Sequence, residues 1–143
     1  MKKLSLALSL LAATAAAAFA NPVEEREAIM KERGGLLRQL APIARGEAPF
    51  DQAAAQALLV KLDENAHRDS VEALFPEGTQ AGSEASPRIW EDMNGYKALW
   101  AKYADTTAAA VAAAPQDQAA LQAAFGTIAA TCSGCHQTYR ISN

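Results

Sequence analysis

Apolar residues recur along most of this chain at alternating spacings of three and four, which is the spacing of one face of an α-helix. In the first such stretch Ile29, Leu36 and Leu40 share one face, and Met30 and Leu37 share the adjacent one. The four predicted helices span approximately residues 23–44, 51–75, 87–115 and 116–139. Because four amphipathic helices with short connections bury their apolar faces by packing together, we expect an all-α fold, an antiparallel four-helix bundle.

Helix-breaking segments separate the four stretches. The first stretch ends at Gly46-Glu47-Ala48-Pro49, and Asp51 has a side chain suited to capping the second. The longest break covers residues 76–86, and Ser86 followed by Pro87 is typical of a helix start.

The first twenty residues have a different character. Lys2 and Lys3 precede a short apolar segment that passes into alanine-rich sequence and ends on small residues at Ala20. This organisation is that of a secretory signal peptide, so we expect residues 1–20 to be cleaved and residues 21–143 to form one bundle domain in the periplasm. No later segment is apolar enough to predict a membrane span.

The charge balance argues against one class of partner. The formal net charge is −3, and loss of Lys2 and Lys3 on processing makes it −5. Binding to nucleic acid depends on clustered Lys and Arg, and no such cluster is present. We therefore expect no nucleic-acid partner, and an acidic surface favours protein partners with basic docking faces.

Both cysteines of the chain lie in the sequence Cys-Ser-Gly-Cys-His near its end. Cys132, Cys135 and His136 form the C-x-x-C-H pattern of c-type haem attachment, and both cysteines fall on core-facing positions of the fourth predicted helix. Positions i, i+3 and i+4 share one helix face, so two thiols can bond one haem while the histidine meets its iron. The sequence thus predicts one covalently bound haem c with His136 as a ligand of the iron.

Other uses of the two cysteines remain open at this point. A disulfide between Cys132 and Cys135 would suit a thioredoxin-like redox motif, but that motif accompanies a βαβ unit that the pattern lacks. A zinc site needs four ligands, and beyond His136 the chain offers only His67 and carboxylates. We expect His67, which lies beside charged residues, to be on the surface.

Met30 and Met93 are the candidates for a sixth ligand of the iron after the leader is removed. Both fall on inward helix faces, and periodicity does not choose between them. Met30 has Gly34 one turn later, where a small residue could leave room for a flat macrocycle, and Arg26 one turn earlier. A guanidinium can pair with a haem propionate, so Arg26 is a candidate for cofactor binding.

These residues together resemble the class II c-type cytochromes, the family of cytochrome c prime. The resemblance covers residues 21–143. It rests on the Cys-Ser-Gly-Cys-His motif followed by Tyr139-Arg140, the 46–51 link, the Pro87-Arg88-Ile89-Trp90 helix start and Arg26. It implies a four-helix bundle with haem at one end, His136 as axial ligand, Arg26 beside the propionates, and often a homodimer through the first two helices.

Met30 departs from the pattern of cytochrome c prime, in which this position usually holds an apolar residue and leaves the iron five-coordinate. The chain is similar instead to the low-spin, methionine-ligated branch of the family. A thioether raises the reduction potential and blocks the face that a gas would use. We therefore expect an electron-transfer protein with redox partner proteins in the periplasm, not an enzyme. The alternative is a five-coordinate protein that binds nitric oxide or carbon monoxide.

Overall fold

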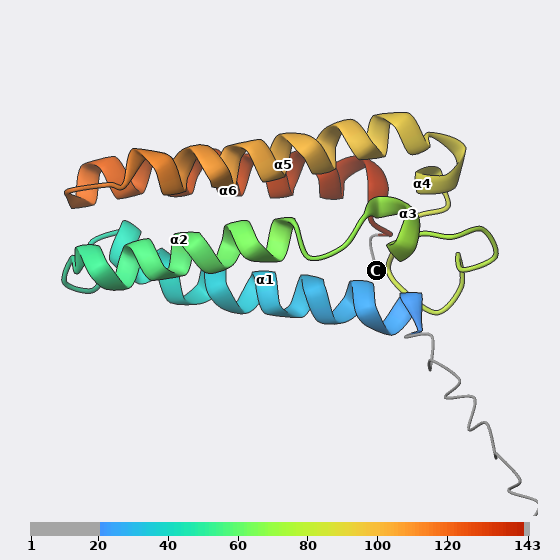
Figure 1. The fold of residues 1–143 in the computed structure, drawn as a ribbon, viewed down its shortest axis with the longest axis horizontal. Coiled ribbons are helices and arrows are strands. Elements are labelled where there is room, and N and C mark those ends of the chain that lie inside the picture. Colours follow the sequence, from blue (N-terminus) through green and yellow to red (C-terminus); the bar gives the residue numbers. More distant parts are fainter. Residues whose placement is uncertain (1–20, 142–143) are drawn as a thin grey trace, which may run out of the picture.

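A computed structural model describes residues 21–141 as a bundle of four long helices with two short ones at one end (Figure 1). The predicted signal peptide, residues 1–20, lies outside this range, and so does its cleavage site. Within residues 21–141 no strand forms, and the only β-type pairing is one bridge between Ala85 and Arg140. The helices are α1 (Pro22–Ala44), α2 (Gln52–Ala66), α3 (Val71–Leu74), α4 (Arg88–Glu91), α5 (Met93–Ala113) and α6 (Gln118–Tyr139).

The long helices pack as two antiparallel hairpins. Helix α1 lies against α2 and α6, and α5 lies against α2 and α6, which closes a four-membered ring of contacts. The two hairpin connections lie at one end of the bundle, and the short helices lie at the other (Figure 1). The expected all-α, antiparallel four-helix bundle is confirmed.

Two predicted helices are shorter than expected because polar residues cap new helix starts inside them. The second was expected to continue to residue 75, but it ends at Ala66, and Ser70 accepts a hydrogen bond from the Ala73 N–H to begin α3. The third is interrupted at Asp92, whose carboxylate accepts from the Gly95 N–H to begin α5. A side chain that satisfies a free backbone N–H competes with continuation of the preceding helix.

Two groups of buried side chains fill the interior. The aliphatic cluster comprises Leu36, Leu40, Ala44, Ala55, Leu59, Leu62, Ala66, Tyr103, Ala110, Leu121 and Ile128. The aromatic cluster comprises Ile29, Val71, Leu74, Phe75, Ile89, Tyr96 and Tyr139, with half-buried Trp90, Met93, Trp100 and Cys135 packed against it. The aromatic cluster lies at the end of the bundle that holds α3, α4 and the cysteines.

The chain between α3 and α4 fastens the end of α6. The Ser86 N–H donates to the Tyr139 carbonyl at 3.0 Å, and the Ile141 N–H donates to the Glu84 carbonyl at 2.9 Å. The Arg140 Nε donates to the Glu84 carboxylate at 2.8 Å. The C-terminal turn of α6, which carries the C-x-x-C-H motif, is therefore held in place by residues about fifty positions earlier.

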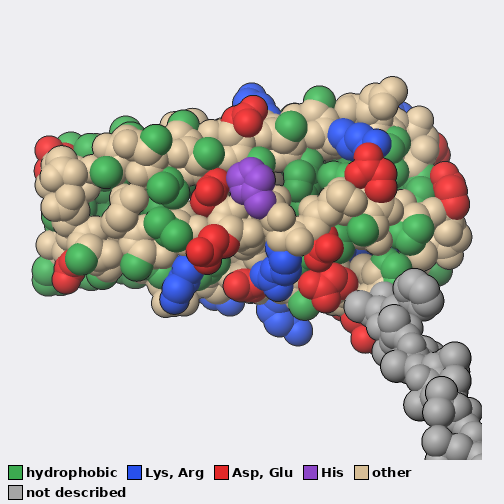
Figure 2. All heavy atoms as spheres, viewed as in Figure 1, with side chains coloured by type: hydrophobic (Ala, Val, Ile, Leu, Met, Phe, Trp, Pro, Cys, Tyr) green, Lys and Arg blue, Asp and Glu red, His purple; other side chains and the backbone are tan. Residues whose placement is uncertain are grey.

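Charged side chains of both signs gather over the middle of the bundle and its aromatic end, and the opposite end shows mainly apolar and uncharged side chains (Figure 2). None of the described helices combines the length and apolar character needed to cross a bilayer.

Candidate functional site

Helix α6 places Cys132 and Cys135 toward the bundle and His136 at its edge. Asp117 caps the helix by accepting from the Ala120 N–H at 2.8 Å, and Ile128, fully buried, anchors the turn before the motif. Both thiols are free and half-buried, although the sequence predicted core positions, and the His136 side chain is exposed. The thiols are less covered than core residues, and exposed positions flank them on α6 at residues 133, 134 and 136.

This geometry bears on the disulfide and the zinc site, the two alternative uses of the motif. Cys132 and Cys135 are not joined by a disulfide. No group of three His, Cys, Asp or Glu within residues 21–141 lies close enough together to hold a metal ion. The arrangement provides two separate thiols and one imidazole on one turn of helix, which is the donor set that haem attachment needs.

The electrostatics keep all three groups neutral near pH 7. Burial raises the pKa of the Cys132 and Cys135 thiols, and the positive charge of Arg33 opposes this in both cases. Partial desolvation is the main cause that lowers the pKa of His136, and the positive charges of Arg140 and Arg33 lower it further. A neutral imidazole is the form that binds a metal, so His136 is in the ligating state at neutral pH.

Met30 lies on α1 at the same end of the bundle, half-buried. Its sulfur is 3.9 Å from Nη1 of Arg33, one turn later on the helix. Met93, at the start of α5, is also half-buried and packs against the aromatic cluster together with Cys135. The structure therefore brings both methionines to the end of the bundle that carries the motif, so their positions alone do not select one of them as the ligand.

Arg33 is a functional candidate that sequence reasoning missed. Its side chain is only 8% exposed, and burial lowers the pKa of the guanidinium. A signal was available, because Arg33 falls between Ile29 and Leu36 on the stripe predicted to be buried, and a charge on an apolar stripe is unusual. The stripe does not reveal the hydrogen-bond partner of Arg33, which is Asn65 on α2. Asn65 is 2% exposed and accepts from Arg33 Nε at 2.9 Å.

Arg26, also on α1, contacts the loop before α4. It is 3% exposed and donates to the Leu74 carbonyl at 3.3 Å, to Thr79 Oγ1 at 3.1 Å and to Ser83 Oγ at 2.8 Å. Its guanidinium also lies 5.1 Å from the ring centroid of Phe75. Arg26 thus fastens the 74–83 segment to α1, and its expected contact with a propionate stays a prediction.

Aromatic rings line the interior beside the motif. Tyr96 lies 4.9 Å from Phe75 and 5.2 Å from Tyr139, centroid to centroid, with edge-to-face geometry. The indole N–H of Trp100 donates to the Ala66 carbonyl at 3.2 Å, and that of Trp90 donates to the Pro76 carbonyl at 3.2 Å. Both indole N–H groups are satisfied, and the rings form a mainly apolar wall beside the motif, which suits a large cofactor.

The residues fit a haem on two further observations. Arg33 Nη2 is buried and has no hydrogen-bond partner within residues 21–141. A Cβ built on Gly34 would meet only Arg38 Nη1 within 4 Å, at 3.4 Å, so the polypeptide itself gives no steric reason for glycine there. A buried donor without a partner, and a glycine that packing within the polypeptide does not require, are both consistent with a bound group beside α1.

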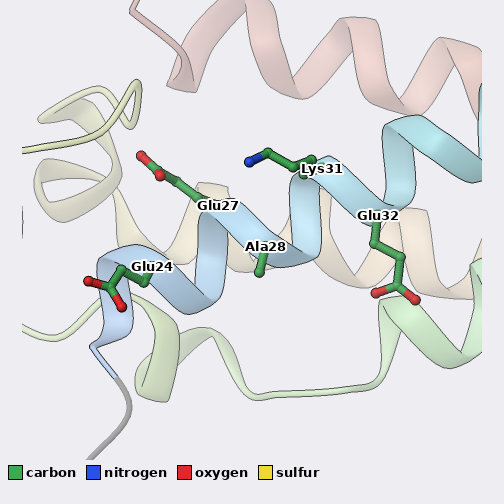
Figure 3. Close-up of a pocket in the computed structure, with 5 residues that line it drawn as sticks. All are labelled: Glu24, Glu27, Ala28, Lys31 and Glu32. Atoms are coloured by element: carbon green, nitrogen blue, oxygen red, sulfur yellow. The ribbon is translucent and has the colours of Figure 1, made fainter.

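A shallow hollow on α1 does not share these properties. It is lined by Glu24, Glu27, Ala28, Lys31 and Glu32, and the charged ends project away from the helix (Figure 3). Cofactor pockets are mainly apolar with few polar groups, so this hollow is not a candidate for the haem site.

His67 was expected on the surface. It is exposed just after the end of α2, and its Nδ1 lies 2.9 Å from the Asp63 carbonyl oxygen.

Comparison with known proteins decides the family. The model of the family described as Cytochrome C' matches residues 21–140. The chain belongs to the cytochrome c prime family. Cytochrome c-556 of Agrobacterium fabrum is 43% identical over 122 residues, covering 85% of this chain and 82% of that protein.

Solved cytochrome c prime structures share the fold. That of Rhodopseudomonas palustris has a TM-score of 0.79 at 32% identity, covering 87% of this chain and 98% of the other. A nitric oxide complex of a mutant cytochrome c prime from Alcaligenes xylosoxidans has a TM-score of 0.76 at 30% identity, covering 87% and 99%. Cytochromes of this family carry covalent haem c with iron, and this cytochrome supplies the two cysteines.

Proposed function

We propose that this cytochrome carries single electrons in the periplasm, with haem c bonded to Cys132 and Cys135 and its iron bound by His136 and Met30. When bound, haem c supplies an iron that gains and loses one electron. The observation that carries the proposal is the thioether of Met30 on α1, half-buried beside Arg33, whose charge also reaches the two thiols and the imidazole on α6.

The residues support a carrier because both ligands come from regular helices. His136 is presented by a helix whose last turn is fastened by the 84–86 segment, and Met30 lies within a regular helix. A ligand set that stays the same in both oxidation states keeps the rearrangement per electron small. A thioether also stabilises the ferrous state relative to an open or water-ligated site.

The alternative is a five-coordinate protein that binds nitric oxide or carbon monoxide. One observation favours it: a solved cytochrome c prime structure with the same fold is a nitric oxide complex. In that case Met30 would line the gas site and not occupy it.

An absorption spectrum before and after reduction, with and without carbon monoxide, separates the two. We expect a six-coordinate low-spin spectrum in both states and little gas uptake by the ferrous form. Met30→Leu should become five-coordinate and take up carbon monoxide readily, whereas Met93→Leu should behave like the unmodified protein. A high-spin spectrum of the unmodified protein would establish the gas-binding alternative.

Location and partners follow from the same proposal. We infer that residues 1–20 direct export and are cleaved after Ala20. We also infer redox partner proteins with basic docking faces and a homodimer that forms through α1 and α2. Mass spectrometry of the mature protein checks cleavage and haem together, and light scattering after size exclusion checks the dimer.

A further inference from the structure

Arg33 is held in one orientation inside the bundle. Its Nε donates to Asn65 Oδ1 at 2.9 Å, and Asn65 is itself fixed because its Nδ2 donates to the Ile29 carbonyl at 3.2 Å. Both side chains are buried, at 8% and 2% exposed. The guanidinium therefore has a defined position, unlike a surface arginine, which samples many rotamers.

Two aromatic rings flank the guanidinium. Its central carbon lies 4.0 Å from the ring centroid of Tyr103 and 4.8 Å from that of Trp100. The negative face of an aromatic ring stabilises a cation, so the two rings partly compensate its removal from water. Burial raises the pKa of Tyr103 to about 12, so its ring stays neutral at pH 7.

The positive charge itself is not neutralised. No carboxylate within residues 21–141 forms an ion pair with Arg33, and its Nη2 has no hydrogen-bond partner there. A buried charge without an anionic partner is costly, and the fold keeps it. A guanidinium is protonated across the pH range in which proteins are stable, so the charge is permanent.

This charge lies directly beside the proposed sulfur ligand. Nη1 is 3.9 Å from the Met30 sulfur on α1. The guanidinium also packs on Trp100, which contacts the aromatic cluster as Cys135 does. Iron bound by Met30 would therefore lie close to a buried cation.

We propose that Arg33 is a fixed positive charge that raises the reduction potential of the iron, a positioning residue that stands beside the Met30 ligand without binding iron itself. Oxidation adds one positive charge to the iron, and a nearby cation in a poorly solvated site opposes it. A hydrogen bond from Nη1 to the ligating sulfur acts in the same direction, because it withdraws electron density from the ligand. This inference rests on the proposed function.

Potentiometric titration of haem-loaded protein tests it. Arg33→Gln removes the charge and leaves an amide that can bond Asn65. We expect the equilibrium constant for reduction to fall at least about tenfold, which is about 59 mV for one electron. Arg33→Lys keeps the charge and should stay close to the unmodified value. Arg45→Gln, at an exposed position that caps the far end of α1, is the matched control and should shift it much less, because its charge is distant and screened by solvent.

The outcomes are separable from those of the proposed function. A six-coordinate spectrum in Arg33→Gln assigns the shift to charge and not to loss of the Met30 ligand. If the unmodified protein is five-coordinate, the electron-carrier proposal fails, while the Arg33 shift remains measurable in that form. Equal potentials for Arg33→Gln and Arg45→Gln overturn the inference.

A second variant covers the case in which Arg33→Gln does not accumulate with haem. Arg33→Met removes the charge and leaves an unbranched apolar side chain that can pack on Trp100 and Tyr103. We expect the same direction of shift, a lower potential. An unchanged potential in Arg33→Met, with haem bound and the spectrum retained, also overturns the inference.

Discussion

The Tyr139 hydroxyl, in the last turn of α6, donates a 2.7 Å hydrogen bond to the Asp92 carboxylate that caps α5. One carboxylate thus receives both a backbone N–H at the start of one helix and a phenol at the end of another. This joins the turn that carries His136 to the helix that carries Trp100, so two walls of the proposed haem site are fixed relative to each other.

Removal of this hydrogen bond should make the free energy of unfolding depend less on pH in the acidic range. The hydrogen bond from Tyr139, followed by that from the Gly95 N–H, lowers the pKa of Asp92 below its ordinary value of 3.8. A carboxylate whose pKa is lowered by folding stabilises the protein above its unfolded pKa, and this is lost as the pH falls through the folded value. Tyr139→Phe should therefore unfold at a lower urea concentration than the unmodified protein at pH 7, and this difference should shrink as the pH falls below 3.8. A difference that does not change with pH would contradict this account.

Gly95 should resist replacement although it lies in a helix. A Cβ there would lie 2.6 Å from the Tyr139 hydroxyl, closer than side chains pack. Glycine to alanine inside a helix normally stabilises by about 1 kcal/mol. Gly126, in α6, has nothing within 4 Å of its Cβ position and is the control. We expect Gly126→Ala to raise the unfolding free energy and Gly95→Ala to lower it, measured by thermal or urea unfolding.

Gly34 should be required by the bound group and not by the polypeptide. Because a Cβ at Gly34 meets only Arg38, Gly34→Leu is expected to leave the helix intact and to change the absorption spectrum of the haem-loaded protein. Gly126→Leu serves as the control and should leave the spectrum as it is. An unchanged spectrum in Gly34→Leu would mean that this glycine does not provide clearance for haem.

Arg26 should matter for the loop before α4 more than for the rest of the bundle. Truncation to alanine leaves the acceptors on Leu74, Thr79 and Ser83 without their donor. We expect a loss of about 2–3 kcal/mol in unfolding free energy, in the range for hydrogen bonds to charged groups. Hydrogen exchange should show faster exchange across residues 74–83 than elsewhere. Uniformly faster exchange would argue against a local role.

The sequence predicted the elements that depend on local pattern. The stripe of Ile29, Leu36 and Leu40 is buried as expected, and the four long helices lie where periodicity placed them. The breaks at Ser70 and Asp92 were missed, because capping competes with continuation by small energies that a pattern of apolar positions does not contain.

The candidate site was predicted in part. The spacing of Cys132, Cys135 and His136 indicates the haem directly, since its chemistry is local to one helix turn. The burial of Arg33 depends on Asn65 from α2 and on Trp100 from α5, which lie far away in the chain. Contacts of this kind arise only when the helices pack, and periodicity along one helix does not contain them.

The two ends of the interior of this cytochrome differ in the kinds of side chain that fill them. The aliphatic cluster consists mostly of Leu, Ile and Ala, whereas the aromatic end has the buried guanidiniums of Arg26 and Arg33 beside its rings. Aliphatic side chains pack stably by themselves, but a buried charge without an anionic partner is costly. A chain that lacks its prosthetic group should therefore melt from one end, keeping the hairpin connections ordered while the helix ends around the thiols loosen.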